Sequence, residues 1–288
     1  MQEKEKRTLR QHLIFVLLTV LAALFIIPVL FVLMNSFKGK LYISDAPFAI
    51  PTGEMFAGLE NYILGIKNTG FFAAFGWSAF ITVGSTLVII LCTSMTAWYI
   101  TRVKNRFTSL LYYVFVFSMV VPFQMVMFTM SKLADMLHLN HPVGMIVLYL
   151  GFGAGLSVFM FCGFVKAIPY EIEESAMIDG CNPLQTFFSI VMPILKPTAI
   201  TVAILNAMWI WNDYLLPYLV IGVSTPYKTI PVAVQYLMGS YGAKDYGSLM
   251  ALLVLSIVPI IVFTWPARST LSKAWWLVRS KDEKLQLI

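Results

Sequence analysis

Long apolar runs separated by short polar connections dominate the chain. We expect six of these runs to be helices, at about 13–34, 71–100, 110–130, 143–165, 198–223 and 249–265. A helix needs about 20 apolar residues to cross the ~30 Å hydrocarbon core of a bilayer. Lipid offers no hydrogen-bond partners, so the backbone must be satisfied within each segment, which favours helices. The pattern therefore predicts an all-α polytopic membrane protein with six transmembrane helices.

Composition supports a membrane location. Hydrophobic residues make up 59% of the 288 residues and charged residues only 12%, whereas soluble domains contain about half apolar and a quarter charged residues. The first apolar run is not followed by a small-residue cleavage site, so we interpret it as a retained first helix with a tolerated kink at Pro28.

The distribution of positive charge predicts the orientation. Fourteen of the 20 Lys and Arg fall in segments that are inside if the N-terminus is inside. Because positive residues are retained in the cytoplasm, both termini are expected there, in a bacterial inner membrane. The net charge of +6 is then a signal of topology, and no nucleic-acid partner is needed to explain it.

The expected organisation is one membrane domain with short ends. Residues 1–11 form a cytoplasmic N-terminal segment, 12–266 the transmembrane domain, and 267–288 a cytoplasmic tail. Within the domain, residues 166–196 form a polar stretch on the inside. We find no internal repeat.

The chain carries little that indicates covalent chemistry. Cys92, Cys162 and Cys181 have no paired spacing, and the spacing of His138 and His141 does not define a metal site. The sequence contains no GxxxxGK[ST] phosphate loop, so no ATP site is expected on this chain. We predict a non-enzymatic chain without a metal or cofactor of its own.

The polar stretch predicts two helices that meet at a sharp corner. Pro169 suits a helix start and Gly180 a helix end, because proline fixes a helical φ and glycine adopts the left-handed cap. A second start follows at Asn182 and Pro183, with Gln185 at the spacing of a capping box. Four acids lie in the first arm: Glu171, Glu173, Glu174 and Asp179. Such a compact polar corner is suited to docking on another protein.

This stretch resembles the EAA loop of binding-protein-dependent ABC importer permeases. Glu-Ser-Ala stands in place of Glu-Ala-Ala, a glycine follows at the family spacing, and nine residues separate it from IVMP in place of Ile-x-Leu-Pro. Ser175 and Met192 are the departures. The resemblance implies a type I importer fold and a coupling helix that docks on a separate ATPase. The residues expected to serve this coupling are Glu174, Ser175, Ala176, Asp179, Gly180, Ile190 and Pro193.

Two further stretches resemble the smaller permease subunit of maltose-type and multiple-sugar importers. They are WNDYLLP, within 211–217, and MVVPFQ, at 119–124. The resemblance covers most of residues 12–264. Aromatic faces stack on sugar rings and amides bind hydroxyls, so we consider six residues for a sugar path: Gln124, Trp209, Trp211, Asn212, Asp213 and Tyr214.

Plainer interpretations stay open for these residues. Glu174 can be a solvated acid and Gly180 an ordinary helix cap. Asp213 is an acid well inside an apolar span, which favours function, but it can also end a helix beside Asn212. The aromatic residues can be ordinary packing or interfacial anchors. The loop 224–246 resembles in position a loop that reaches into the sugar-binding protein, or it is a plain connector.

The end of the chain departs from the family. Such subunits commonly finish with a short basic, Gly/Ala-rich tail, whereas after Phe263 this chain reads TWPARSTLSKAWWLVRSKDEKLQLI. Family-like codons shifted by one base can be written to give most of this stretch. We hypothesise that the tail, 267–288, is a frameshift product, and resequencing the gene decides this.

The sequence thus predicts the permease subunit of an ATP-driven, binding-protein-dependent sugar importer. The resemblance implies four kinds of partner: a homologous second permease, a pair of ATPase subunits that bind ATP and Mg²⁺, an extracytoplasmic sugar-binding protein, and lipid. The alternative is a secondary transporter driven by an ion gradient. That class favours internal repeats and several midplane charges, whereas this chain offers only Asp213.

Overall fold

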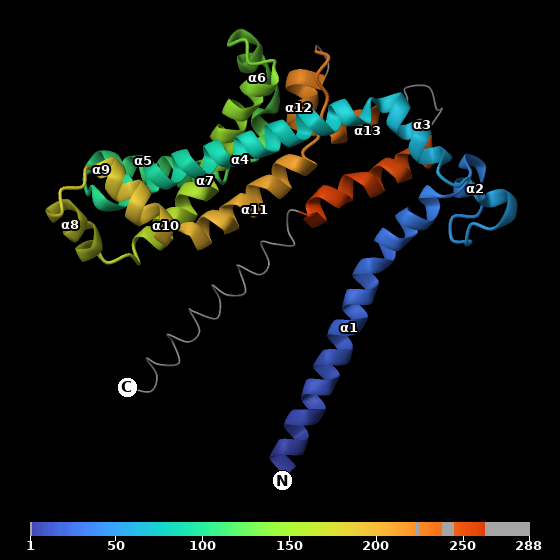
Figure 1. Ribbon diagram of the computed structural model, residues 1–288, viewed down its shortest axis with the longest axis horizontal. Coiled ribbons are helices and arrows are strands. Elements are labelled where there is room, and N and C mark those ends of the chain that lie inside the picture. The colour runs from blue at the N-terminus through green and yellow to red at the C-terminus, as the bar shows by residue number, and fades with distance from the viewer. Residues whose placement is uncertain (1, 223–224, 238–244, 263–288) are drawn as a thin grey trace. The chain divides into compact units, whose positions relative to one another are not determined.

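The computed structural model describes residues 2–222, 225–237 and 245–262 (Figure 1). Within these residues the chain forms helices and turns, and extended pairing is limited to one isolated antiparallel bridge between Lys38 and Phe56. The predicted all-α class is confirmed. The chain divides into two compact units, Met1–Phe71 with Ala233–Val258, and Phe72–Val232 with Pro259–Ile288.

In the part of the chain that the structure describes, three helices have the length and apolar composition of single membrane spans. They are α1 (Gln2–Ser36), whose apolar part is Gln11–Ser36, α4 (Phe71–Arg102) and α7 (Pro142–Val165). The first, second and fourth predicted spans are therefore confirmed. Pro28 lies inside α1, and the helix continues through it without interruption.

The third predicted span is not one straight helix. It consists of α5 (Arg106–Ser118) and α6 (Phe123–Met136), which are bent by 106° at the break between them. Pro122 occupies the N-cap of α6. A proline has no N–H to donate, and it disfavours a helical conformation for the residue before it, so the helix ends and restarts there.

The fifth predicted span, 198–223, is also broken. α11 (Lys196–Asn212) stops at Asp213, which has extended backbone angles. It is preceded at a 76° bend by the segment Pro183–Ile194. The short elements around α11 are α9 (Pro183–Thr186), the π-helical η2 (Phe187–Val191), α10 (Met192–Ile194), α12 (Leu215–Pro217) and the π-helical η3 (Tyr218–Gly222).

The sixth predicted span, 249–265, falls on a shorter apolar helix, Tyr246–Val262. Among the described residues, the three long helices and the two bent pairs supply up to five spans by length and composition, and this shorter helix lies at the position of the predicted sixth. The predicted tail, 267–288, lies outside the described residues. Part of the predicted loop 224–246 is described, and it forms α13 (Ile230–Tyr236).

The core of the unit Phe72–Val232 lies where α4, α7 and α11 run alongside one another (Figure 1). Ile89, Tyr149, Phe161 and Val202 are among its buried residues. Gly153 makes the close approach possible, because a Cβ at this position would lie 2.7 Å from both Asn206 Oδ1 and Ile89 Cδ1. A side chain there would force α7 away from its neighbours.

The predicted outer loop, 37–70, is more ordered than a plain connection. It contains α2 (Lys40–Asp45), a 3₁₀ turn η1 (Gly53–Met55) and α3 (Glu60–Thr69). Asn61 donates from Nδ2 to the carbonyls of Ser36 (2.8 Å) and Lys38 (2.7 Å). The buried Lys38 ammonium donates to the carbonyls of Ala46 (2.8 Å) and Pro47 (3.0 Å), and burial lowers its pKa. These buried donors explain why this polar segment folds.

Candidate functional site

The first arm of the polar corner is the helix α8 (Tyr170–Ile178). Pro169 is its N-cap, and acids occupy the first turn, where negative charge is favourable beside the unpaired N–H groups. At the other end Gly180 has φ +85°. The Gly180 N–H donates to the Met177 carbonyl (3.1 Å) and the Cys181 N–H to the Ala176 carbonyl (3.0 Å). This double hydrogen bond is a Schellman cap, so the predicted helix end is confirmed.

The second arm begins two residues later. Asn182 accepts from the Gln185 N–H (2.9 Å), and Gln185 Oε1 accepts from the Asn182 N–H (2.8 Å). Pro183 holds the first helical position. The predicted capping box is therefore confirmed, and the two caps lock a tight corner between α8 and α9.

Beyond the corner the helix widens into η2. The Met192 N–H donates to the Phe187 carbonyl, five residues back, and Pro193 follows with no N–H of its own. Proline disrupts the ordinary i to i−4 ladder, which suits a π-helical turn at this place. Ile190 is half-buried within η2, and Pro193 is exposed in α10.

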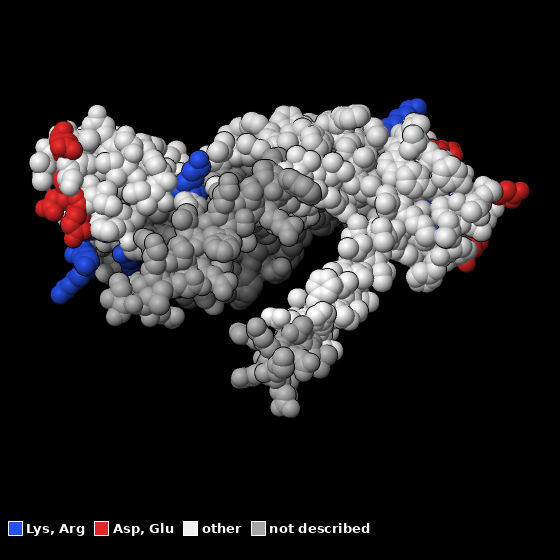
Figure 2. Space-filling view, turned by 60° about the horizontal axis from the view of Figure 1, so that its bottom comes forward, with Lys and Arg blue, Asp and Glu red and all other residues white. Residues whose placement is uncertain are grey.

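The corner presents apolar and acidic side chains together. Its exposed apolar side chains are Ile172, Met177, Ile178, Leu184 and Phe188, and its exposed acids are Glu171, Glu174 and Asp179. Figure 2 shows acids gathered at this end, with basic side chains next to them. We call these eight side chains the docking surface. A mixed apolar and acidic surface of this kind is suited to contact with another protein.

The structure separates the three residues of the Glu-Ser-Ala element. Glu174 and Ser175 are exposed, and the Ser175 hydroxyl donates to the Glu171 carbonyl at 2.8 Å. Ala176 is buried against the protein. Glu174 and Ser175 are therefore accessible to a partner, whereas Ala176 packs α8 against the rest of the chain.

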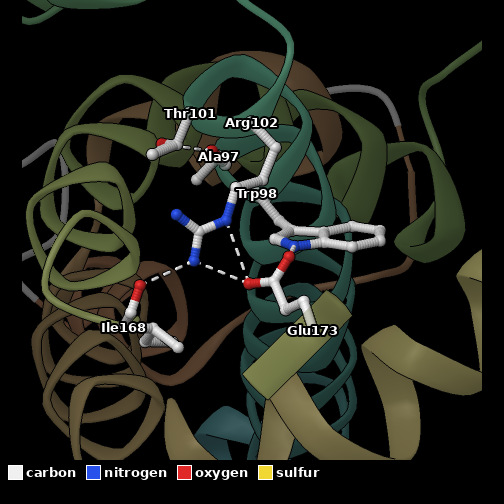
Figure 3. Close-up of polar contacts among 6 residues, drawn as sticks. All are labelled: Ala97, Trp98, Thr101, Arg102, Ile168 and Glu173. Atoms are coloured by element: carbon white, nitrogen blue, oxygen red, sulfur yellow. Dashed lines mark hydrogen bonds and ion pairs between the residues drawn. The ribbon is translucent and has the colours of Figure 1, made fainter. Parts of the chain in front are cut away.

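The most deeply buried acid of the corner is one that our sequence analysis did not single out. Glu173 is completely buried. Its Oε1 accepts from Arg102 Nη2 (2.6 Å) and Nε (2.9 Å), and its Oε2 accepts from Trp98 Nε1 (2.9 Å) (Figure 3). The signal that could have found it is helical spacing, because Glu173 lies three residues before the small apolar Ala176 and so shares its face.

Two of the six residues considered for a sugar path meet at a tyrosine of α7. The buried Tyr149 hydroxyl donates to Asp213 Oδ2 (3.0 Å), and Asp213 Oδ1 accepts from the Leu215 N–H (3.0 Å). The Trp209 ring lies edge-on to Tyr149, with the centroids 5.5 Å apart. Asp213 thus both caps the break after α11 and ties it to α7, a role that our sequence analysis left open beside transport.

Trp211 faces a different part of the unit. It is buried, lies edge-on to Phe75 of α4 (5.7 Å), and lines a cavity of about 260 Å³ with mostly aliphatic walls. Tyr214 stacks on Tyr218 (5.1 Å), and the exposed Asn212 donates to the Met208 carbonyl (2.7 Å). Gln124 is exposed in the first turn of α6. The six residues therefore do not converge on one pocket within this chain.

The contacts of Asp213 make a prediction about stability. Asp213→Ala removes both hydrogen bonds and leaves the Tyr149 hydroxyl unpaired, so it is expected to lower the free energy of unfolding by about 1–3 kcal/mol. Asp213→Asn can still accept from the Leu215 N–H and donate to the tyrosine, and is expected to cost much less. Thermal unfolding of the purified protein in detergent micelles measures both. An asparagine variant that is stable but inactive in uptake would show that the charge serves transport.

The sequence matches a known family over residues 89–268, described as the binding-protein-dependent transport system inner membrane component. The chain belongs to this family. It is therefore a transport component of the inner membrane, and the secondary-transporter alternative is not favoured.

Two relatives within this family align over nearly their whole length. The probable starch degradation products transport system permease protein AmyC of Thermoanaerobacterium thermosulfurigenes is 37% identical, over 92% of this chain and 95% of AmyC. The multiple sugar-binding transport system permease protein MsmG of Streptococcus mutans is 33% identical, over 86% and 89%.

A solved structure shares the fold. A chain of a bacterial ABC transporter that imports the acidic polysaccharide alginate superimposes with a TM-score of 0.67 at 18% identity, covering 88% of this chain and 93% of that one. The type I importer fold implied by the EAA resemblance is thus supported by the arrangement of the helices themselves.

Proposed function

We propose that this chain is the permease subunit of an ATP-driven, binding-protein-dependent sugar importer, and that its docking surface receives force from a separate ATPase. The observation that carries the proposal is the capped corner of α8 and α9. Two helices are locked at a left-handed glycine and a capping box, and their exposed side chains are apolar and acidic. The sequence has no phosphate loop, so ATP and Mg²⁺ bind on the partner.

Apolar contact is expected to dominate the docking. Exposed ion pairs contribute only about 0–1 kcal/mol each, so the acids add specificity more than affinity. Ile178 is 81% exposed and Leu184 59% exposed, and burial of such a side chain contributes about 1.5–3 kcal/mol. The acids around them fit a partner cleft with basic residues at its rim.

The names of the relatives support a sugar as cargo. AmyC is named as a probable permease for starch degradation products and MsmG as a permease of a multiple sugar-binding transport system, and this chain carries the WNDYLLP stretch that resembles sugar importer subunits. A second structure of the alginate transporter is a complex with a sugar-bound periplasmic protein. We infer that this chain works with an extracytoplasmic sugar-binding protein, a second permease and an ATPase pair.

The two broken spans support a path near their breaks. Irregular backbone at membrane depth is tolerated only where protein covers it or where it lines a water-filled cavity. The two second halves, α6 and η3, also contact each other, because the Ser131 hydroxyl donates to the Leu219 carbonyl (3.1 Å). Gln124 and Asp213 lie beside the two breaks. We propose that this region lines part of the sugar path once the second permease is present.

Energy coupling provides the test of this function. Cells that express the chain with its neighbouring transport genes are offered radiolabelled maltose, maltotriose and raffinose. Uptake of at least one sugar is expected to stop on ATP depletion and to survive a protonophore in cells whose ATP level is maintained. Loss of uptake with the protonophore alone would contradict the proposal and favour an ion-driven carrier.

The native Cys181 provides a test of orientation. It is half-exposed at the corner, whereas Cys162 is buried and the exposed Cys92 lies within the apolar helix α4. A membrane-impermeant maleimide is expected to label inside-out vesicles and not right-side-out vesicles, with Cys181→Ser as the control that removes the signal. Labelling of Cys181 from the outside would place the docking surface on the wrong face for an ATPase.

A further inference from the structure

A buried ion pair joins α8 to the inner end of α4. The Glu173 carboxylate is fully buried, with both oxygens occupied by Arg102 and Trp98, and only 17% of the Arg102 side chain is exposed (Figure 3). We call these three side chains the latch. The docking surface does not include these side chains, so contact with a partner does not explain why the ion pair is present.

The latch is one of few attachments that α8 has. Among the nine residues of α8 only Glu173 and Ala176 are buried. Arg102 Nη2 also donates to the Ile168 carbonyl (2.9 Å) ahead of the helix, and its guanidinium carbon lies 5.7 Å from the centre of the Tyr170 ring. The Arg102 side chain of α4 therefore contacts both the start of α8 and the segment that leads into it.

Trp98 extends the latch to the second arm of the corner. Its ring lies 5.6 Å from the ring of Phe187, which is fully buried in η2. One turn of α4, from Trp98 to Arg102, thus contacts the chain on both sides of the corner. The chain itself connects the corner to α7 and α11, whereas α4 reaches the corner through side-chain contacts, among them those of Trp98 and Arg102.

A buried ion pair of this kind fixes the relative position of two helices more than it stabilises the fold. A buried ion pair adds little net stability, because desolvation offsets much of the attraction. The Arg102 guanidinium and the Trp98 indole N–H fix the distance and orientation of the Glu173 carboxylate relative to α4, since charge-assisted hydrogen bonds to an arginine are short and directional. The latch is therefore suited to holding α4 and α8 in one relative position.

α4 is long enough to transmit a movement of its inner end to the outer side of the membrane. It is a single helix of 32 residues, which corresponds to about 48 Å at 1.5 Å per residue. Near its outer end Phe75 contacts Trp211, and the Ser78 hydroxyl accepts from the Ile230 N–H (2.8 Å). A rigid element with both ends attached transmits displacement from one to the other.

We propose that Glu173, Arg102 and Trp98 are positioning residues that make α4 move with the coupling corner, so that the ATPase drives the outer side of the bundle through α4 as well as through α7 and α11. This inference rests on the proposed function. It adds a specific side-chain connection between the corner and a helix that is distant in sequence.

The test measures sugar transported for each ATP hydrolysed. The complete transporter, purified with its partners, is reconstituted in proteoliposomes with the sugar of the panel that the unaltered transporter imports. Arg102→Gln and Glu173→Gln each remove one charge of the latch. Lys104→Gln is the matched control, because Lys104 is an exposed cation two residues from Arg102. Trp98→Phe keeps an aromatic ring beside Phe187 but removes the N–H that donates to Glu173.

The latch predicts uncoupling, with hydrolysis continuing while transport falls. The ratio of sugar to ATP is expected to drop by about 5- to 150-fold in Arg102→Gln and Glu173→Gln, the usual range for coupling between sites. Lys104→Gln is expected to keep the ratio. The exchanged pair Arg102→Glu with Glu173→Arg is expected to recover part of it, which guards against variants that simply assemble poorly.

Two results would overturn the proposal. An unchanged ratio in the assembled single variants would mean that the latch only stabilises the fold. An exchanged pair no better than either single variant would mean that the charge pairing is irrelevant. Failure of the proposed function is distinguishable from both, because the unaltered transporter would then show no ATP-dependent uptake.

Discussion

Replacing Gly180 with valine is expected to abolish ATP-driven sugar uptake while the chain still inserts into the membrane. Gly180 has φ +85°, and forcing a β-branched residue into this region costs about 1–3 kcal/mol. No atom lies within 4 Å of an added Cβ, so backbone strain is the whole effect. The corner relieves this strain by opening, which separates Ile178 from Leu184 on the docking surface. Uptake by cells, normalised to membrane content, is the measurement.

Two comparisons isolate the backbone as the cause. Gly180→Asn is expected to retain much more uptake, because asparagine tolerates the left-handed conformation better than other side chains. Gly163→Val is the control for adding a valine, since Gly163 is an exposed helical position of α7 with nothing within 4 Å of an added Cβ. Equal uptake in Gly180→Val and Gly163→Val would contradict the role assigned to the corner.

The second large effect is expected at Ile178, whose side chain is 81% exposed at the end of α8. Ile178→Lys removes an apolar contact worth about 1.5–3 kcal/mol and adds a charge that the partner must desolvate. The ATPase is therefore expected to bind at least about tenfold more weakly, given 1.4 kcal/mol for each factor of ten. Retention of the ATPase subunit during purification measures this loss.

A matched control separates docking from general effects of charge. Ile50 is 73% exposed in the segment between α2 and η1, which the charge pattern places on the opposite side of the membrane. Ile50→Lys is expected to retain the ATPase fully. If Ile178→Lys retains it equally well, the exposed apolar side chains of the corner do not form the contact.

Local rules predicted the corner well because its structure is determined locally. Gly180 ends α8 and Asn182 with Gln185 caps α9 through hydrogen bonds between residues at most five apart. The long helices were equally predictable, since an apolar run of sufficient length has few alternatives to a helix in lipid. Both features depend on short stretches of sequence alone.

The latch could not be predicted in this way. Glu173 and Arg102 are 71 residues apart in the chain, and only tertiary packing brings them together. Glu173 and Glu174 are chemically identical neighbours, so the family spacing drew attention to the exposed one. Helical periodicity relative to Ala176 distinguishes them, but only once the buried face of α8 is known.

The breaks in two spans were missed for a related reason. The apolar pattern continues through Met119–Pro122 and through Asp213–Pro217, so hydrophobicity alone predicts uninterrupted helices. Pro122 lacks an N–H and stands at the start of α6, and the Asp213 carboxylate accepts from the Leu215 N–H at the start of the turn after α11. The same two breaks border the residues considered for the sugar path, in keeping with a functional origin.

Photo-cross-linking at the corner tests the central claim most directly. A benzoylphenylalanine placed at Ile178 in the complete transporter is irradiated, and the cross-linked partner is identified by mass spectrometry. The expected product joins this chain to a protein that carries a GxxxxGK[ST] phosphate loop, and Ile50 substituted in the same way gives no such product. Cross-links at Ile178 only to lipid, or to an extracytoplasmic protein, would contradict the account.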